Sequence, residues 1–193
     1  GNTPRGHDHR GRWSELFSGV VGSIGTIETS PLAHPEEFGV SPIANVFDPE
    51  EVAISLGLAL GRRHFEDSLG ACNFTLGTTV TLICGALSAV TGWNYTKEEA
   101  MRLGQRTSAL FRAFSARCGH TPDMEWPSPR YGSTPKDGPA VGQSVIQNWE
   151  VMHQKYYEVT GLDYQTGNPL PEVLENLGLL DVLEQIWGSK IHS

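Results

Sequence analysis

The stretch DSLGACNF, residues 67–74, brings an acid, a glycine and a cysteine close together in a chain that has only three cysteines. A thiolate is a strong ligand for iron and other soft metal centres. A glycine lets the backbone approach a bound group closely. A thiol that only fills a gap in the core is the alternative interpretation of Cys72. The pattern therefore indicates either an inorganic cofactor at Cys72 or a packed side chain.

A second candidate lies near the start of the sequence, where His7 and His9 flank Asp8. Two histidines separated by one residue can bind zinc from an extended segment. A polar surface cluster is the alternative. The neighbouring residues Arg5 and Arg10 give this segment a local positive charge that could face an anionic group.

Composition narrows the class of protein. The chain has 193 residues and a formal net charge of −8, from 14 basic and 22 acidic side chains. That balance argues against a general nucleic-acid binder. The most apolar run, Val80–Val90, is too short to span a membrane and is interrupted by polar residues. Three widely spaced cysteines do not suggest a disulfide framework, so we expect a reducing, cytoplasmic location.

The elements that must position these residues are predicted to be helices. Asp48 is a suitable cap before Pro49, and Thr96 with Glu99 forms a capping box, while Gly119 supplies a helix stop. Hydrophobic spacing and turn signals predict helices over 13–21, 49–65, 78–90, 97–118, 149–160, 171–177 and 180–187. No convincing β-hairpin signal occurs. The predicted fold class is all-α, as one helical domain over 1–193, with 1–47 largely irregular and 48–193 forming the helical core.

Large apolar side chains predict which helix faces are buried. In the helix over 97–118 they recur at helical spacing, and we expect this stripe in the core: Leu103, Thr107, Leu110, Phe114 and Cys118. Cys84 and Cys118 are both predicted to be core thiols rather than ligands. The five tryptophans are expected to be packing anchors: Trp13, Trp93, Trp126, Trp149 and Trp187.

Five landmarks in order resemble one family: Arg5-Gly6-His7-Asp8-His9, Asp67–Cys72, Ala89–Glu99, Tyr156–Gly161 and Leu170–Leu179. Together they are similar to the C-terminal domain of the aldehyde:ferredoxin oxidoreductases of the tungsten-pterin class. The resemblance covers nearly the whole chain. The Asp-x-x-Gly-Leu-Cys element of the family departs here in one position, because Ala71 replaces leucine and keeps it apolar.

The resemblance implies specific roles at this element. Cys72 is then the fourth thiolate ligand of a [4Fe-4S] cluster whose other three cysteines lie elsewhere. Asp67 hydrogen-bonds the pterin ring, and Gly70 and Ala71 belong to the same cofactor-binding element. His9 is the expected histidine near the metal, where an imidazole can donate to a carbonyl oxygen or relay a proton. His7 is the alternative.

The implied reaction is oxidation of a small aldehyde by water to a carboxylic acid, with electrons passing through the cluster to ferredoxin. A bis-pterin of tungsten or molybdenum carries the two-electron chemistry. The family's N-terminal pterin-binding and cluster-binding domains are not in this sequence. We therefore expect a fragment or subunit that alone holds no cofactor and has no activity, and no nucleic-acid or membrane partner.

Two other functions fit parts of the pattern. A small metallohydrolase could use His7, Asp8 and His9 with a distant ligand, either His34 or Asp67, and bound zinc or manganese would favour it. A non-catalytic helical interaction module is the second alternative, and the absence of any pterin domain upstream or on a partner chain would favour that function.

Overall fold

The computed structural model describes residues 8–22, 33–71 and 75–188, and within these ranges the fold is all-α, as predicted. One isolated antiparallel bridge joins Leu162 and Pro169. The helices are α1 (Trp13–Val21), α2 (Pro49–Ser68), α3 (Val80–Thr91), α4 (Lys97–Arg117), α5 (Val145–Thr160), α6 (Pro171–Asn176) and α7 (Leu180–Trp187), with short 3-10 turns η1 (His9–Gly11), η2 (Pro35–Phe38) and η3 (Pro122–Met124).

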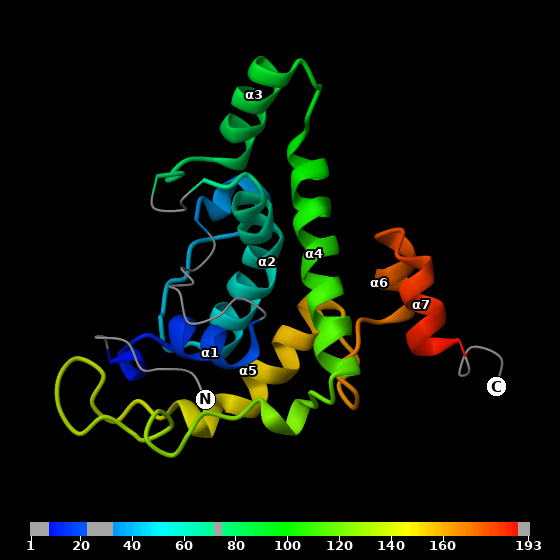
Figure 1. Cartoon of the computed structure of the whole chain (residues 1–193). Coiled ribbons are helices and arrows are strands. Elements are labelled where there is room, and N and C mark those ends of the chain that lie inside the picture. Colours follow the sequence, from blue (N-terminus) through cyan, green and yellow to red (C-terminus); the bar gives the residue numbers. More distant parts are fainter. Residues whose placement is uncertain (1–7, 23–32, 72–74, 189–193) are drawn as a thin grey trace.

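Helix α2 is the centre of the arrangement, because both α4 and α5 pack against it. Figure 1 shows α2 and α4 side by side, with α1 near one end of α2 and α3 projecting beyond the other end. The pair α6 and α7 lies on the opposite side of α4 from α2. None of the helices in the described ranges combines the length and apolar character needed to cross a membrane.

The local signals at the helix ends are confirmed. The Asp48 carboxylate accepts a hydrogen bond from the Glu51 amide at 2.8 Å. In the capping box, the Thr96 hydroxyl accepts from the Glu99 amide at 3.2 Å, and the Glu99 carboxylate accepts from the Thr96 amide at 2.9 Å. Gly119, just after α4, has a φ of 91°, in the left-handed region that favours glycine.

The described residues form three clusters of buried side chains, two of which lie near the candidate sites. The first joins α1, the N-terminal half of α2 and α5 through Trp13, Phe17, Ala53, Trp149 and Tyr156, among others. The second lies at the other end of α2, where its members are Phe65, Val80, Ile83, Cys84 and Ala100. The third joins α4 to α6 and α7. Residues that belong to the first and second clusters therefore stand at different ends of α2.

The predicted core face of α4 is wrong for its C-terminal half. Leu110 and Phe114 are 43% and 66% exposed, and Cys118 is an exposed thiol rather than a core one. The side of α4 that faces its neighbours is lined by small residues together with Arg112: Ala100, Gly104, Ala109 and Ala113 are buried. Small side chains allow α2 to approach closely, and Leu110 and Phe114 are turned outward.

Cys84 is buried, as predicted. Among the tryptophans, Trp13 and Trp149 are fully buried anchors, whereas Trp93 and Trp126 are 65% and 53% exposed. Trp126 still packs against Trp149, with ring centroids 5.9 Å apart. Trp93 belongs to the uncovered part of the segment after α3.

Candidate cofactor-binding element and buried polar network

Asp67 lies in the last turn of α2, and its carboxylate faces outward. The side chain is 43% exposed, and its Oδ2 lies 3.2 Å from Nε of Arg63, one helical turn earlier. The backbone then turns through Gly70, which has a φ of 67° and donates its amide hydrogen to the Asp67 carbonyl at 3.2 Å. This left-handed turn ends the helix and directs the chain toward Ala71, which is half-buried. Cys72 lies outside the described residues.

The space above Gly70 is open. A Cβ added at this position would meet no atom within 4 Å, so a bound group can approach the backbone here. The C-terminal end of a helix carries unpaired carbonyl oxygens and a partial negative charge. With the Asp67 carboxylate, this end presents hydrogen-bond acceptors, which suit a ligand edge rich in N–H donors such as a pterin ring. The residues present therefore fit the implied group.

His9 begins η1 and belongs to a different local cluster. Its Nε2 lies 3.4 Å from Oε2 of Glu15, and its side chain is only 15% exposed. Its ring centroid is 6.1 Å from that of Tyr131. Its Nε2 is buried and makes no hydrogen bond to any described residue.

The carboxylate of Asp8, which lies between the two histidines in the sequence, accepts hydrogen bonds from Arg10. Nε of Arg10 donates to Oδ1 of Asp8 at 2.9 Å, and the Arg10 backbone amide donates to the same oxygen at 3.1 Å. These bonds, led by the Arg10 side chain, lower the pKa of Asp8 to about 2. His7 and Arg5 lie outside the described residues.

The described structure does not bring His9 and Asp67 together. The turn that holds His9 packs with α1, and α1 packs on α2 near Ala53. Asp67 lies fourteen residues further along α2, about 20 Å away at the usual helical rise. A single bound group that touched both residues would have to extend along most of α2.

His64 precedes Asp67 by three residues on α2 and was not expected from the sequence to matter at this site. It is 5% exposed, its Nε2 is buried without a hydrogen-bond partner, and its ring lies 5.5 Å from that of Phe111. Burial lowers its pKa, and this outweighs the opposing effect of the Asp67 charge. The His-x-x-Asp spacing was visible in the sequence, but its burial against α4 was not.

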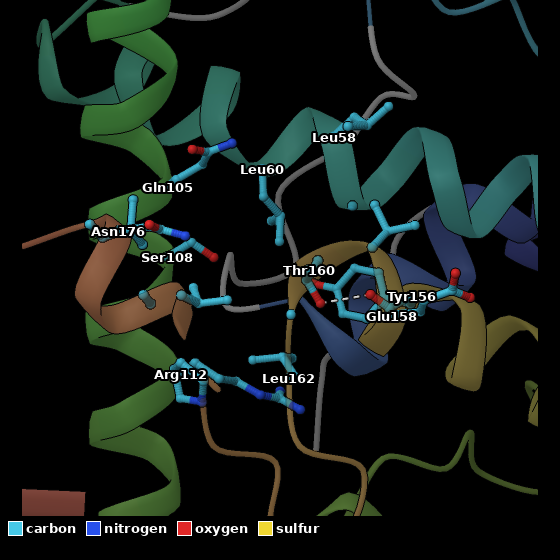
Figure 2. A pocket seen from close by; sticks show the side chains of 17 residues that line it. Leu58, Leu60, Gln105, Ser108, Arg112, Tyr156, Glu158, Thr160, Leu162 and Asn176 are labelled. Carbon is cyan, nitrogen blue, oxygen red and sulfur yellow. Dashed lines mark hydrogen bonds between the residues drawn. The ribbon is translucent and has the colours of Figure 1, made fainter. Parts of the chain in front are cut away.

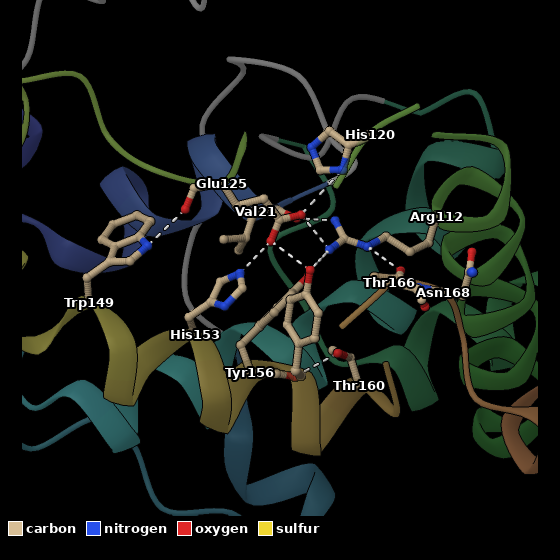
Figure 3. A network of polar contacts seen from close by, with 12 residues as sticks. Val21, Arg112, His120, Glu125, Trp149, His153, Tyr156, Thr160, Thr166 and Asn168 are labelled. Carbon is tan, nitrogen blue, oxygen red and sulfur yellow. Dashed lines mark hydrogen bonds and ion pairs between the residues drawn. The ribbon is translucent and has the colours of Figure 1, made fainter. Parts of the chain in front are cut away.

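A buried polar network forms around Glu125, which lies in the loop between α4 and α5 (Figure 3). Its carboxylate is fully buried and pairs with the guanidinium of Arg112. Nε2 of His153 lies 2.6 Å from Oε2, and the hydroxyl of Tyr157 donates to the same oxygen at 3.0 Å. The indole N–H of Trp149 donates to the Glu125 carbonyl at 2.9 Å. The network ties the loop to both α4 and α5.

Arg112 extends the network to two further segments. Its Nε donates to the Gly167 carbonyl at 3.1 Å and its Nη1 donates to the Val21 carbonyl of α1 at 3.4 Å. Its guanidinium also lies 5.2 Å from the ring centroid of Tyr157. Burial raises the pKa of Tyr157, so this phenol stays protonated near neutral pH. Since the buried charges are paired, the arrangement serves to fix the fold rather than to supply a free acid or base.

A cavity of about 400 Å³ lies between α2, α4, α5 and α6 (Figure 2). Its walls are largely apolar, with Leu60, Leu162 and Val173 among the lining residues, and Gln105 and Ser108 add polar groups from α4. The α2 residues that line it are Gly57, Leu58 and Leu60, so the cavity lies beside the middle of α2 and not at Asp67. No signal in the sequence pointed to it.

Within residues 8–22, 33–71 and 75–188, no group of three or more histidine, cysteine or carboxylate side chains is arranged to hold a metal ion. The zinc site considered for His7, Asp8 and His9 depends in part on His7, which lies outside these ranges.

Comparison with known proteins finds a family match over most of the chain. A family model described as "Aldehyde ferredoxin oxidoreductase, domains 2 & 3" matches residues 2–179. The tungsten-containing aldehyde ferredoxin oxidoreductase of Pyrococcus furiosus is 30% identical over 118 residues, which is 60% of this chain and 19% of that protein. The chain thus aligns with about a fifth of the length of this relative.

Proposed function

Because the chain belongs to the aldehyde ferredoxin oxidoreductase family, we propose that it is the helical portion of an oxidoreductase that converts aldehydes to carboxylic acids and passes electrons to ferredoxin. The observation that carries this proposal is the family match over residues 2–179. The remaining parts of the enzyme, which bind most of the cofactor, belong to the same polypeptide or to a partner chain. A bound tungsten or molybdenum pterin supplies the two-electron chemistry.

The proposed contribution of Asp67 is to hold the pterin edge. Its carboxylate is exposed and has lone pairs beyond those facing Arg63 at 3.2 Å. Gly70 leaves its surroundings open, because a Cβ added there would have no atom within 4 Å. A carboxylate accepts without donating, so it orients a ring whose edge carries N–H groups.

The proposed contribution of Cys72 is one thiolate ligand to a [4Fe-4S] cluster. Such clusters usually have four thiolate ligands, so three must come from outside this chain if Cys72 supplies one. The other two cysteines are in unsuitable places. Cys84 is buried, its pKa is raised by desolvation, and its thiol donates to the Thr96 carbonyl at 3.5 Å. Cys118 follows the C-terminal end of α4, away from α3 and from the end of α2 that carries Asp67.

The proposed contribution of His9 is proton transfer near the substrate. Its Nε2 is 3.4 Å from Glu15 Oε2, and an imidazole can donate to a carbonyl oxygen or relay a proton. This role is independent of the Asp67 assignment. His9 lies beside α1, near the N-terminal half of α2, whereas Asp67 lies in the last turn of α2.

The test uses the assembled protein with its cofactors. Cys72→Ser is expected to remove or destabilise the cluster, because a serine oxygen is a poorer ligand for iron than a thiolate. Cys84→Ser and Cys118→Ser are matched controls that leave the cluster intact. Asp67→Asn is expected to spare iron and reduce tungsten and pterin content. Iron and tungsten analysis with the paramagnetic signal of the reduced cluster measures all four variants, and an unchanged cluster in Cys72→Ser would contradict the assignment.

The chain by itself is expected to be inactive, because one cysteine cannot hold a four-iron cluster. Elemental analysis of the chain alone is expected to find no tungsten and no stoichiometric iron. Aldehyde-dependent dye reduction by this chain alone would overturn the proposal that the site is shared with other parts of the enzyme.

A further inference from the structure

Helix α3 projects from the body of the molecule and leaves one side uncovered (Figure 1). Val90 is 87% exposed, Trp93 is 65% exposed and Leu82 is 62% exposed. Leu82 and Val90 lie two helical turns apart on α3 with small exposed residues between them, and Trp93 follows directly after the left-handed Gly92 that ends the helix. We call this surface the α3 face, and it consists of Leu82, Gly85, Ala86, Ala89, Val90 and Trp93.

The α3 face carries no charge. No acidic or basic residue and no histidine occurs between Thr75 and Thr96, although the chain as a whole has a net charge of −8. Single exposed apolar residues are ordinary, but a contiguous apolar patch marks a surface that contacts another molecule or domain. An uncharged face offers nothing to a phosphate backbone or a charged protein surface, so it suits an apolar partner.

Helix α3 is anchored to the body at its first turn. The Glu37 carboxylate accepts from the amides of Val80 and Thr81 at 2.9 and 2.7 Å, at the first turn of the helix. Lys97 donates to the Glu37 carbonyl at 2.8 Å, and Arg62 donates to the Thr78 carbonyl at 2.6 Å. These bonds connect the start of α3 to η2, α2 and α4.

The middle of the face is shallow. Gly85, Ala86 and Ala89 have small side chains or none, and a Cβ added at Gly85 would meet nothing within 4 Å. Larger side chains, Leu82 and Trp93, stand toward the two ends. This relief allows another helix to approach closely at the centre and to pack between the larger residues.

We propose that the α3 face is the docking surface for the portion of the oxidoreductase that supplies the rest of the cofactor site. This inference rests on the proposed function and specifies where that portion docks. Two observations favour this occupant. The relative in Pyrococcus furiosus has four-fifths of its length outside the aligned part, since only 19% of it is covered. The Asp67–Ala71 element ends α2 at the end from which α3 projects, so a partner that completes a cofactor site there also reaches α3.

The experiment maps what touches Val90 in the complete protein, isolated with all its parts. Val90→p-benzoylphenylalanine places a photo-cross-linker on the α3 face. Met124→p-benzoylphenylalanine is the matched control, because Met124 is also an exposed apolar residue, 63% exposed, in η3 beyond the opposite end of α4. Cross-linked peptides are identified by mass spectrometry after irradiation.

We expect the Val90 probe to cross-link to a peptide of an aldehyde ferredoxin oxidoreductase polypeptide outside the part that corresponds to residues 2–179, and the Met124 probe not to do so. A cross-link to α3 of a second copy, to an unrelated protein or to lipid would overturn the inference. So would the absence of any cross-link at Val90, or the same cross-linked peptide from both probes.

A second measurement uses hydrogen exchange. In the assembled protein, amides of residues 80–91 are expected to exchange at least ten-fold more slowly than in the chain alone. Val90→Glu is expected to abolish this slowing, because it buries a charge in an apolar contact, whereas Met124→Glu is expected to leave it unchanged. Equal exchange in the assembled and isolated states would contradict the proposal.

These results separate the inference from the proposed function. An assembly that contains tungsten and pterin but is not contacted through Val90 would refute the docking surface and leave the function standing. An assembly that contacts Val90 through a family polypeptide but contains neither metal nor pterin would refute the function and leave the surface standing.

Discussion

Gly104 of α4 lies directly against the backbone of Gly61 of α2, so that a Cβ at position 104 would stand 1.6 Å from the Gly61 carbonyl oxygen. The obstacle is backbone and not the end of a flexible side chain, so it has no easy way to move. The close approach of α2 and α4 therefore depends on the absence of a side chain at this position. It also explains why small residues, and not Leu110 or Phe114, line the buried side of α4.

Gly104→Ala is expected to lower the free energy of unfolding by about 3 kcal/mol, the upper end of the usual range for overpacking. The helices must separate to admit the methyl group. Gly85→Ala is the matched control, because its Cβ meets nothing within 4 Å in α3, and alanine stabilises a helix interior by about 0.5–1 kcal/mol relative to glycine. Urea unfolding of both variants measures the difference, and equal stability would show that the helices are further apart.

Glu125→Gln is expected to lower the free energy of unfolding by about 3 kcal/mol, because removing one partner of a buried ion pair leaves the other charge uncompensated. Here the uncompensated charge is that of Arg112, whose side chain is 7% exposed. Thermal unfolding provides the measurement.

Glu158→Gln is the control for this prediction. Glu158 pairs with Lys155 at 2.9 Å, but its side chain is 69% exposed, and exposed pairs contribute at most about 1 kcal/mol. If both variants unfold alike, the Glu125 network does not hold the loop to the helices.

The sequence was sufficient for the elements whose signals are local. The cap at Asp48 and the box of Thr96 and Glu99 act within one helical turn, and both appear as predicted. The family and its all-α fold were also visible from the order of short motifs. The starts of α2 and α4 depend only on neighbouring residues, which is why they could be predicted. Other boundaries differ, because α5 begins at Val145 rather than 149 and α2 ends at Ser68 rather than 65.

The sequence was not sufficient for relationships between distant segments. The face of α4 was assigned from large apolar residues, whereas the structure buries its small ones, because contact with α2 is set by Gly61 and Gly104. The role of Glu125 could not be predicted, because its partners Arg112 and His153 come from two other elements. The α3 face likewise could not be predicted, because its exposure depends on α3 projecting beyond the other helices.

His64 provides a pH-dependent contribution to stability. Burial lowers its pKa in the folded state, whereas the unfolded chain binds the proton near the ordinary value of about 6.5. The unfolded state therefore holds more protons below that pH, and the free energy of unfolding falls as pH decreases from about 6.5 toward the folded pKa. Above about 6.5 this contribution is constant.

The measurement compares urea unfolding of the parent and His64→Leu between pH 7.5 and 5. The variant is expected to lose less stability than the parent over this range, because leucine has no proton to bind. His34→Leu is the control, because His34 is exposed at 38% and lies 3.2 Å from Glu36. The same pH dependence in the parent and in His64→Leu would show that His64 does not contribute.

Glu37 is expected to control the attachment of α3 to the body. Burial alone would raise its pKa, but hydrogen bonds from Thr81 and Val80 outweigh it and lower the pKa from its ordinary value. A carboxylate whose folded pKa is lowered stabilises the fold fully above its unfolded pKa, about 4.3, and loses that contribution as pH falls through the folded pKa.

Glu37→Gln removes this charge from the first turn of α3, where a carboxylate accepts from free amides and interacts with the positive end of the helix. Hydrogen exchange of residues 80–91 in the chain alone is expected to accelerate by about ten-fold, equivalent to about 1.4 kcal/mol and within the usual range for loss of a helix cap. The core of α5 is expected to be unaffected, because it packs in a different cluster.

Glu36→Gln is the matched control, since its side chain is 65% exposed and pairs with His34 at 3.2 Å, away from the first turn of α3. At pH 3 the parent is expected to approach the exchange pattern of Glu37→Gln, after correction for the intrinsic pH dependence of exchange. Unchanged exchange in α3 would mean that the buried residues Val80 and Ile83 hold the helix without the carboxylate.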